Sequence, residues 1–431
     1  MARQHAQKLA LLVQLLAYGL WTSISTLRRA LSIKIQLLAE QTHRRPTNSS
    51  EIKNVIVVGA AFAGYSAART LANSLPRDGS YRVVVVEPNS HFNFTWVLPR
   101  FCVVEGESHK PFIPYTPTFF SQSPKGMVRW VRDRVASVQK GRVVLRSGHE
   151  LPYEFLVIAT GSTGVNGLPS RPGVEDREAG MQLLAQMQAR IKTAARVVIA
   201  GGGAAGVELA ADAKDKYPDK SITLVHSRQA LMHRFGPGLQ KGAMDALERL
   251  GVDVILGERA DSQSADGKSL TLSSGRKIEC DCFINCIGQK PASGLVAGAA
   301  PNAIAPTGHI RVKPTLEIDD NALPNVFVCG DVADTKVANP NSKSATRQAE
   351  IAAYNVAMAA RGRKPVHTYQ EVWVDEFINL TVGFERSLTH FWGGTSELLF
   401  RGRATDPDVM CKRAWAGLAG KPFEDTGVYS G

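Results

Sequence analysis

The sequence predicts an α/β fold with two Rossmann-like nucleotide-binding domains and a small C-terminal α+β region. Two stretches, at residues 54–87 and 196–227, each read as a buried strand, a glycine-rich turn, a helix and a second strand. Three further apolar runs, at 156–162, 283–291 and 325–334, each lead into a glycine. With 431 residues and 44% hydrophobic side chains, the chain can bury at least two cores.

The order of these stretches predicts one nucleotide unit inserted within another. The first domain is expected in two parts, at residues 51–165 and 296–365, with the second domain between them at 166–295. Residues 1–50 are predicted as a helix followed by a polar linker, and 366–431 as the C-terminal region.

The N-terminal segment predicts a long amphipathic helix. No charged residue occurs from Leu9 to Leu27, a run whose polar residues make it only marginally able to span a bilayer. Apolar residues recur every three or four positions: Leu9, Leu12, Val13, Leu16, Leu20, Ile24, Leu27, Leu31, Ile35 and Leu38. We expect either a membrane-surface contact through residues 9–38 or a mitochondrial presequence, because the segment is basic and almost free of acids. A helix packed on the protein's own surface is the alternative.

Charge and cysteine content narrow the function classes. The net charge is +12, and half of that excess lies in residues 1–50, where seven basic residues meet a single acid. This distribution favours an anionic surface near the N-terminus over a nucleic-acid-binding face on the folded domains. The six cysteines form no CxxC pair and no zinc pattern, so neither a redox disulfide nor a metal site is expected.

The first nucleotide unit contains the turn GAAFAG after a strand of four β-branched residues. Gly59 and Gly64 are the outer glycines of a GxGxxG pattern, and Ala61 replaces the middle one. Small residues there let a pyrophosphate approach the unpaired N–H groups of the helix N-terminus. Glu87, at the end of the second strand, can accept hydrogen bonds from ribose hydroxyls.

The second unit carries the full pattern in AGGGAAGVELA, with Gly201, Gly203 and Gly206. Glu208 is expected on the first turn of the following helix, either as a favourable charge at the helix N-terminus or facing a nicotinamide.

The strand after this helix ends without the acid that recognises the ribose of NAD. His226, Ser227 and Arg228 stand there instead and offer hydrogen-bond donors and a cation. These groups suit the 2′-phosphate of NADPH and tolerate NADH.

The last of the apolar runs, NVFVCGDVAD, delivers Asp331 to a turn where a carboxylate can bind the ribityl chain of a flavin. Gly288, in FINCIGQKP, is a further candidate for cofactor binding. In this order the segments predict FAD held by residues 55–87 and Asp331, and NADPH or NADH held by 201–228. The nicotinamide can then lie against the flavin and transfer a hydride.

These motifs, together with VVVVEPNSHFNF and IATGS, resemble the AMID group of flavoproteins. This group consists of apoptosis-inducing-factor-homologous, mitochondrion-associated proteins and includes ferroptosis suppressor protein; it is similar to type II NADH dehydrogenases. The likeness covers residues 52 to about 365. It implies a pyridine-nucleotide-disulfide oxidoreductase-like fold without the redox cysteine pair. It also implies an enzyme with non-covalent FAD that oxidises NAD(P)H and reduces a quinone at a membrane face without pumping protons.

The resemblance also implies roles for individual residues. It assigns the flavin site to Gly59, Gly64, Glu87, Thr160, Gly161 and Asp331, and the nicotinamide site to Gly201, Gly203, Gly206 and Glu208. Arg100 falls where the group has an arginine near the flavin, and Lys343 where it has a lysine close to the isoalloxazine. A lysine there can stabilise negative charge on a reduced flavin or a quinone, and Lys343 and Glu208 are the candidates for proton supply.

Residues 371–385 predict a strand that pairs with 396–404 across a turn containing Gly393 and Gly394. Phe391, Trp392 and Trp415 are candidates for an apolar tunnel that holds a quinone tail, with core packing as the alternative. A short helix is predicted in DPDVMCKRAWAGLAG, with its cap near Asp406.

Three functions stay open at this point. The first is NAD(P)H:quinone reduction at a mitochondrial membrane or at the cytosolic face of an organelle. The second is reduction of a soluble carrier or of a substrate of specialised metabolism. The third is a DNA-binding or cell-death effector, which the charge distribution disfavours. The oligomeric state is also open, with a homodimer as one alternative.

Overall fold

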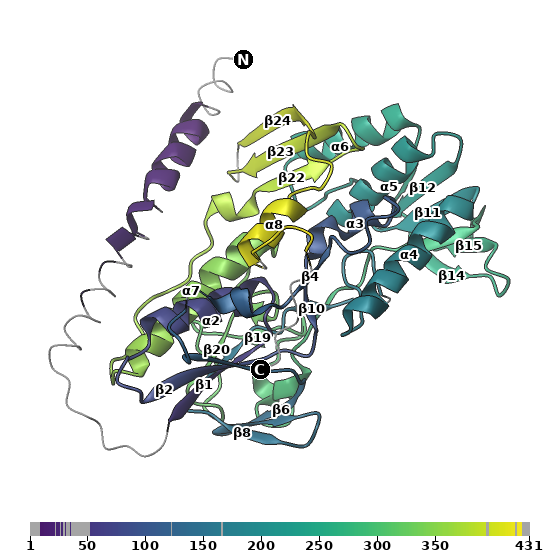
Figure 1. Cartoon of the computed structure of the whole chain (residues 1–431). Helices are drawn as coiled ribbons and strands as arrows, with labels where there is room; N and C mark the ends of the chain where they lie inside the picture. Colours follow the sequence, from purple (N-terminus) through teal and green to yellow (C-terminus); the bar gives the residue numbers. More distant parts are fainter. Residues whose placement is uncertain are drawn as a thin grey trace.

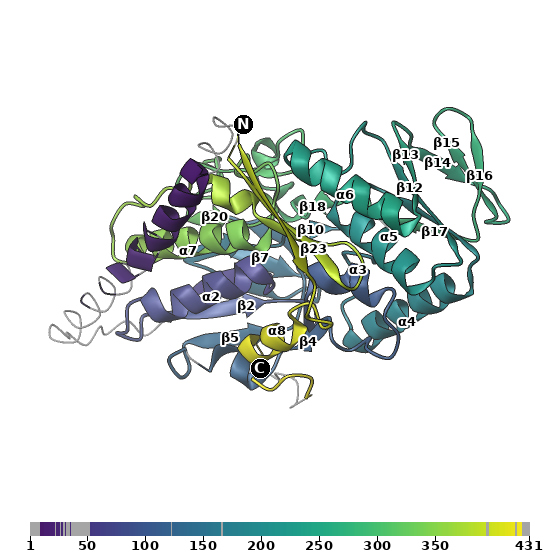
Figure 2. The same ribbon diagram turned by 90° about the horizontal axis from the view of Figure 1, so that it is seen from above.

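The computed structural model describes residues 9–21, 23–25, 27–28, 31, 35, 52–121, 123–164, 167–393, 396–418 and 420–424. Within these residues, the two largest sheets are parallel and lie beside each other with helices packed on them (Figure 1). Seen from above, the N-terminal helix lies next to α7 (Ser342–Ala359), where Tyr18 faces Lys343 (Figure 2). The predicted α/β fold with two Rossmann-like units is confirmed.

The first sheet has five parallel strands in the order β20-β9-β1-β2-β5. Its strands are β1 (Lys53–Val58), β2 (Tyr81–Val86), β5 (Val128–Val131), β9 (Phe155–Ile158) and β20 (Val326–Val328). The last four residues of β1 and of β2 are all buried, because β-branched side chains pack well on both faces of a covered parallel sheet. Helices α2 (Phe62–Ser74) and α7 (Ser342–Ala359) pack against each other and on this sheet.

The second sheet has four parallel strands in the order β13-β12-β11-β17. Its strands are β11 (Arg196–Ala200), β12 (Ser221–His226), β13 (Asp253–Leu256) and β17 (Cys282–Asn285). Helices α5 (Ala204–Lys216) and α6 (Pro237–Leu250) pack on its strands, and α4 (Arg177–Thr193) precedes β11. Asp176 caps α4 by accepting hydrogen bonds from two N–H groups of the first turn, and Gly251 ends α6 in the left-handed conformation.

The four strands of the second sheet lie between β9 and β20 in the sequence, so the first sheet closes only after the second is complete. The chain crosses between the units at a short antiparallel pair, β10 (Ser162–Thr163) and β18 (Lys290–Pro291). The exact domain boundaries stay predictions.

Smaller antiparallel sheets decorate both units. They are β3 (His91–Asn93) with β4 (Phe112–Pro114); β6 (Val135–Gln139), β7 (Arg142–Leu145) and β8 (Glu150–Pro152); and β14 (Ala260–Gln263), β15 (Ser269–Leu272) and β16 (Lys277–Glu279). A parallel pair joins β19 (Ile310–Arg311) to β21 (Ala333–Asp334), and α3 (Leu98–Phe101) lies between β3 and β4 in the sequence.

The C-terminal region differs in part from its prediction. Residues 371–385 do not form one strand: η5 (Trp373–Glu376) is a single helical turn, β22 (Ile378–Thr381) is short, and a turn follows. The strand at 396–404 is found as β24 (Glu397–Arg403), but it pairs with β23 (Arg386–Trp392) and not with β22. Alternation of polar and apolar residues could not reveal the helical turn. Asp375 holds it, because its N–H donates to the carbonyl of Val372 and its carboxylate accepts from the N–H of Val372. Helix α8 (Cys411–Leu418) follows a turn in which Asp406 accepts hydrogen bonds from two N–H groups.

The N-terminal helix at residues 9–21 contacts the rest of the protein through a face other than the predicted apolar stripe. Leu11 is 4% exposed, and Tyr18 and Leu15 are partly buried. The predicted apolar stripe points away from the protein: Leu9, Leu16, Leu20 and Leu27 are all more than 60% exposed. Of the described residues, no helix is both long and apolar enough to cross a membrane. Leu38 lies outside the described residues.

Candidate functional site

The outer glycines of both turns are required by close packing of the backbone. A Cβ on Gly64 would lie 1.8 Å from the carbonyl oxygen of Gly59, and a Cβ on Gly206 would lie 1.8 Å from that of Gly201. Gly59 and Gly201 also have φ angles of +96° and +114°, which L side chains rarely adopt. The two predicted turns therefore have the same construction, with the first turn of each helix seated on the strand end.

The middle positions of the turns are open. Ala61 and Gly203 are the N-caps of α2 and α5, and neither helix has a side-chain cap or an acid in its first turn. Both residues are exposed, and a Cβ on Gly203 would meet no protein atom within 4 Å. Neither helix N-terminus is closed by a side chain, and the open position at Gly203 leaves room for the phosphates of a dinucleotide, which helix N-termini favour.

Glu87 joins the end of β2 to the first turn. Its carboxylate is 3% exposed and accepts hydrogen bonds from the N–H of Ala60 (2.6 Å) and of Asn89 (2.8 Å). Burial raises the pKa of this carboxyl, and the hydrogen bonds from Asn89 and Ala60 act in the opposite direction. The acid therefore lies beside the uncapped N-terminus of α2, and its role at a ribose stays a prediction.

The segment after β9, which contains Ser162 and Arg171, contacts Asp331 after β20. Its Oδ2 atom lies 3.3 Å from Nη2 of Arg171 and 3.4 Å from Oγ of Ser162. Thr160 donates its hydroxyl to the carbonyl of Ala292 at 2.8 Å, which ties the crossing strands together. The structure therefore brings the segment that contains Ser162 and Arg171 together with Asp331, which follows 160 or more positions later in the sequence. Arg171 was missed, because a lone arginine in a proline-containing loop has no recognisable spacing.

Two other predicted glycines lie in the same crossing. Gly161 and Gly288 have φ angles of +66° and +87°, so each supports a turn that a larger residue would strain. The carbonyl of Gly161 accepts a hydrogen bond from the N–H of Ala292.

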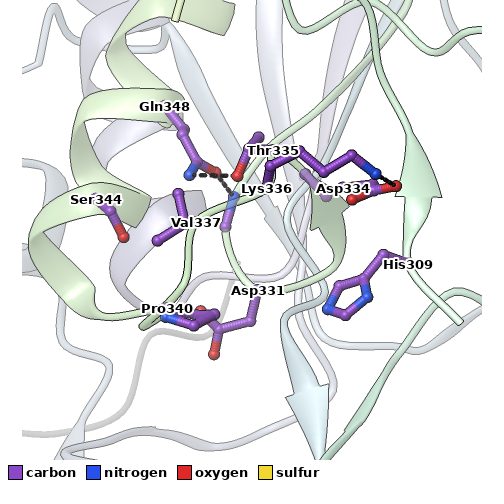
Figure 3. A pocket seen from close by; sticks show the side chains of 11 residues that line it. His309, Asp331, Asp334, Thr335, Lys336, Val337, Pro340, Ser344 and Gln348 are labelled. Atoms are coloured by element: carbon purple, nitrogen blue, oxygen red, sulfur yellow. Dashed lines mark hydrogen bonds and ion pairs between the residues drawn. The ribbon is translucent and has the colours of Figure 1, made fainter. Parts of the chain in front are cut away.

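A cavity of about 60 Å³ extends from Asp331 to the start of α7 (Figure 3). Gln348 closes one side, accepting a hydrogen bond from the N–H of Gly330 and donating one to Thr335. The lining residues are His309, Gly330, Asp331, Ala333, Asp334, Thr335, Lys336, Val337, Pro340, Ser344 and Gln348. Asn341 caps α7 in a capping box with Ser344, which fixes the direction in which the helix leaves the cavity.

Lys343 is the second residue of α7, as predicted, and lies next to the cavity-lining Ser344. Its ammonium donates to the carbonyl of Val374 at 3.4 Å and stands 5.7 Å from the centre of the Tyr18 ring. Partial desolvation lowers its pKa, while the carboxylate of Asp375 acts to raise it. The lysine is therefore held in place by groups from two other segments, and its role at a flavin stays a prediction.

Glu208 does not lie on the first turn of its helix, which corrects the sequence expectation. Helix α5 begins at Ala204, one turn earlier, so the charge of the helix N-terminus does not explain this acid. Its Oε1 accepts hydrogen bonds from both the N–H and the hydroxyl of Thr381, at 3.1 Å each. Desolvation raises the pKa of Glu208 to about 8, and the nearby Asp212 carboxylate adds to that effect. The protonated form of Glu208 is thus favoured by its surroundings more than that of an ordinary carboxyl group.

Arg100 lies in a buried ion pair. Its Nε atom is 2.7 Å from Oδ2 of Asp212, Nη2 donates to the carbonyl of Gly383 at 2.9 Å, and the guanidinium lies 4.5 Å from the Phe384 ring centre. Both charged side chains are at most 3% exposed. These contacts join α3, α5 and the turn after β22. They explain why a buried arginine occurs at position 100 without any contact with a flavin. Contact with a flavin stays a prediction.

His226 faces inward, whereas Ser227 and Arg228 are exposed. The imidazole is 7% exposed, and its Nδ1 accepts a hydrogen bond from the N–H of Gly202 at 3.1 Å. A Cβ on Gly202 would lie 2.7 Å from the ring, so this glycine is needed to seat the histidine. Burial, with His233 and Arg228 nearby, lowers the pKa of His226. A nucleotide phosphate at this strand end would therefore meet Ser227 and Arg228, with His226 supporting the turn.

The thiols are all free, and five of the six are buried. Trp415 is fully buried and donates its indole N–H to the carbonyl of Lys110, so it packs in the core and lines no tunnel. Phe391 and Trp392 are partly buried, and Phe391 lies 4.9 Å from Phe377 between ring centres.

A family model described as pyridine nucleotide-disulphide oxidoreductase matches residues 53–360. The chain belongs to this family. The oxidoreductase is 33% identical to Fe-regulated protein 8 of Mycosarcoma maydis, over 80% of this chain and 90% of that protein. It is 31% identical to ferroptosis suppressor protein 1 of Taeniopygia guttata, over 73% of this chain and 83% of that protein. The resemblance read from the motifs is thereby confirmed.

The fold of the oxidoreductase is also similar to that of the sulfide:quinone oxidoreductase of Aquifex aeolicus, with a TM-score of 0.68 over 86% of this chain and 93% of that one. The two chains are 16% identical. The oxidoreductase is an FAD-dependent enzyme of the ferroptosis suppressor protein group, and its family implies FAD and NAD(P)H as cofactors.

Proposed function

We propose that this enzyme transfers a hydride from NAD(P)H to FAD and passes the electrons on to a quinone-type acceptor. The observation that carries the proposal is the pair of uncapped helix N-termini, at α2 on the first sheet and at α5 on the second. The strands β10 and β18, which connect the two sheets, pass between them, and Ser162 of β10 contacts Asp331. One dinucleotide on each sheet brings its reactive ring toward the crossing between them.

FAD would be held by the turn at Gly59, Ala61 and Gly64, by Glu87 at its ribose and by Asp331 at its ribityl chain. The flavin supplies the redox chemistry, since it accepts a hydride and releases electrons to a second substrate. The protein needs no nucleophile for this reaction. Its task is to align two rings and to exclude water around them.

NAD(P)H would be held by the turn at Gly201, Gly203 and Gly206. The exposed Ser227 and Arg228 suit the 2′-phosphate, so we propose NADPH as the better substrate and NADH as an accepted one. A plain ribose would still find the hydroxyl of Ser227.

Glu208 and Lys343 are the groups proposed to manage charge and protons. Glu208 is protonated at neutral pH because its pKa is raised to about 8. Lys343 brings a positive charge to the start of α7, where it would stabilise negative charge on the acceptor.

We place the reaction at a membrane surface, either mitochondrial or on the cytosolic face of an organelle. The supporting feature is the outward face of the N-terminal helix, which carries Leu16 at 74% exposure, together with the basic residues of that segment. Exposed apolar side chains flanked by lysine and arginine are typical of helices that lie in a lipid interface. No contact with nucleic acid is proposed.

The test follows flavin absorbance of the full-length protein under anaerobic conditions. NADPH should bleach the flavin faster than NADH, and a short-chain ubiquinone should then restore its colour. Bleaching without reoxidation by quinone would instead support reduction of a soluble carrier. A purified protein that holds no flavin, or that ignores both coenzymes, would contradict the proposal.

A further inference from the structure

Three distant segments meet around Lys343. They are the N-terminal helix at residues 9–21, the first turn of α7 and the helical turn η5. Tyr18 brings its ring to within 5.7 Å of the Lys343 ammonium, and the carbonyl of Val374 accepts from that ammonium. Ser344, the residue after Lys343, lines the cavity that begins at Asp331, so this meeting point is one residue away from that cavity in the sequence.

A buried ion pair between Arg347 and Asp375 lies beneath Lys343 and Tyr18. Arg347 contacts Asp375, which is 1% exposed, and Tyr369 donates its hydroxyl to the same Oδ2 at 3.4 Å. The other carboxylate oxygen, Oδ1, is buried and finds no hydrogen-bond partner in the described part of the chain. The charge of Asp375 acts on both Tyr18 and Lys343, so these groups form one electrostatic cluster.

The wall beside this cluster is apolar and comes from the N-terminal helix. Leu11 packs over Gly393 at the tip of the β23–β24 hairpin, where a Cβ on the glycine would lie 2.6 Å from the leucine side chain. On the same hairpin, Phe391 groups with Phe377 and Trp373. The same face of the helix therefore contacts the hairpin through Leu11 and reaches Lys343 two turns later through Tyr18.

We propose that the N-terminal helix forms the outer wall of the acceptor site, and that Tyr18 positions Lys343 and lines the entrance for a lipophilic quinone. The inference rests on the proposed quinone reductase function. The ammonium is a hydrogen-bond donor suited to a quinone carbonyl oxygen, and the phenol ring offers a flat surface for the quinone ring. The outward leucines of the same helix place this entrance next to lipid, so a long apolar tail need not cross water.

The experiment uses the full-length protein in detergent and compares Tyr18→Ala with Gln14→Ala. Gln14 lies on the same helix, is polar and exposed, and does not belong to the outward leucines, so it is the matched control. We expect Tyr18→Ala to raise the KM for a decyl-substituted ubiquinone by roughly tenfold, which is 1.4 kcal/mol of lost binding. Flavin reduction by NADPH and turnover with ferricyanide should change less than twofold in both variants.

A second variant, Tyr18→Phe, keeps the ring over Lys343 and removes the hydroxyl. Its KM for the lipophilic quinone should rise less than that of Tyr18→Ala. An unchanged KM in Tyr18→Ala, in a protein that reduces the quinone normally, would overturn the role of Tyr18 and leave the proposed function standing. A loss of ferricyanide turnover equal to the loss with quinone would also overturn it, because the helix would then act on the whole fold. A wild-type protein that bleaches with NADPH and never reduces quinone would refute the proposed function itself.

Discussion

Burial raises the pKa of two carboxyl groups of α5, Glu208 and Asp212. The pKa of Glu208 is raised to about 8, whereas the ion pair with Arg100 opposes the shift of Asp212. An unfolded chain releases these protons near the ordinary carboxyl pKa values of about 4. Between those values the folded state holds more protons than the unfolded state, so stability falls as the pH rises toward 8.

Glu208→Gln should weaken that pH dependence, because the amide cannot ionise. We expect the melting temperature of the wild-type protein to drop more than that of the variant between pH 5.5 and 8.5. The difference should be roughly 1 °C for each kcal/mol that the ionisation of Glu208 contributes, the shift expected for a chain of this size. Differential scanning fluorimetry measures it, with Glu248→Gln on the exposed face of α6 as the control. Equal drops in the wild type and Glu208→Gln would show that Glu208 ionises freely in the folded protein.

Arg100→Met should destabilise the fold, because it leaves the buried carboxyl of Asp212 without its partner. Removing one member of a buried pair costs about 3–5 kcal/mol, whereas replacing both by apolar groups is often neutral. Urea denaturation should therefore show a large loss for Arg100→Met and a recovery in Arg100→Met/Asp212→Leu. If the double variant is stable yet purifies without flavin, Arg100 contacts the cofactor after all.

At the level of residues, the sequence predicts what depends on neighbours in the chain. Gly64 and Gly206 could be found because each must clear a carbonyl only five residues away. Arg100 could not be matched to Asp212, because the two lie 112 positions apart and neither belongs to a motif. The contact of Tyr18 with Lys343 could not be predicted for the same reason. Tyr18 lies on the less apolar face of its helix and contacts Lys343 only in the tertiary fold.

The glycine turns are the elements on which both nucleotide sites depend. Gly64→Ala should push α2 away from β1, because the added methyl would meet the carbonyl oxygen of Gly59. We expect a stability loss of about 1–3 kcal/mol, the range for overpacking, and a purified protein with little flavin. The ratio of flavin to protein absorbance measures the cofactor content.

Ala61→Gly is the matched control for that change. Ala61 is exposed at the N-cap of the same helix, so its replacement removes a methyl from the mouth of the site without disturbing packing. This variant should keep its flavin. A Gly64→Ala protein that retains as much flavin as Ala61→Gly would show that the close turn is not needed for binding.

Among the elements, long runs of one type were predicted well and short ones poorly. The valine-rich strands β1 and β2 and the helices after them follow the sequence pattern, because burial on both faces leaves few alternatives. In the C-terminal region the strands have four to seven residues. Which of these short strands pair with each other depends on contacts with the rest of the fold. The sequence could therefore predict strands there but not which pair they form.

At the scale of the whole molecule, the outward face of the N-terminal helix predicts binding to lipid. The full-length protein should float with vesicles that contain phosphatidylserine, and Leu16→Asp/Leu20→Asp should abolish this. Each basic residue near an anionic surface adds about 1 kcal/mol, so raising the salt concentration should also weaken binding. Flavin content should be equal in both proteins. Binding that persists in the double variant would show that this helix does not hold the protein on the membrane.

The interrupted first sheet has a consequence for the order in which the chain folds during synthesis. Its edge strand β20 and its covering helix α7 leave the ribosome after the whole second sheet, whose four strands all precede β20 in the sequence. The inserted unit can therefore fold while the earlier strands still lack their neighbour, and long-range pairing of β9 with β20 comes late. A nascent chain stopped before residue 326 should protect its coenzyme-binding half from protease and leave the FAD-binding half open to cleavage.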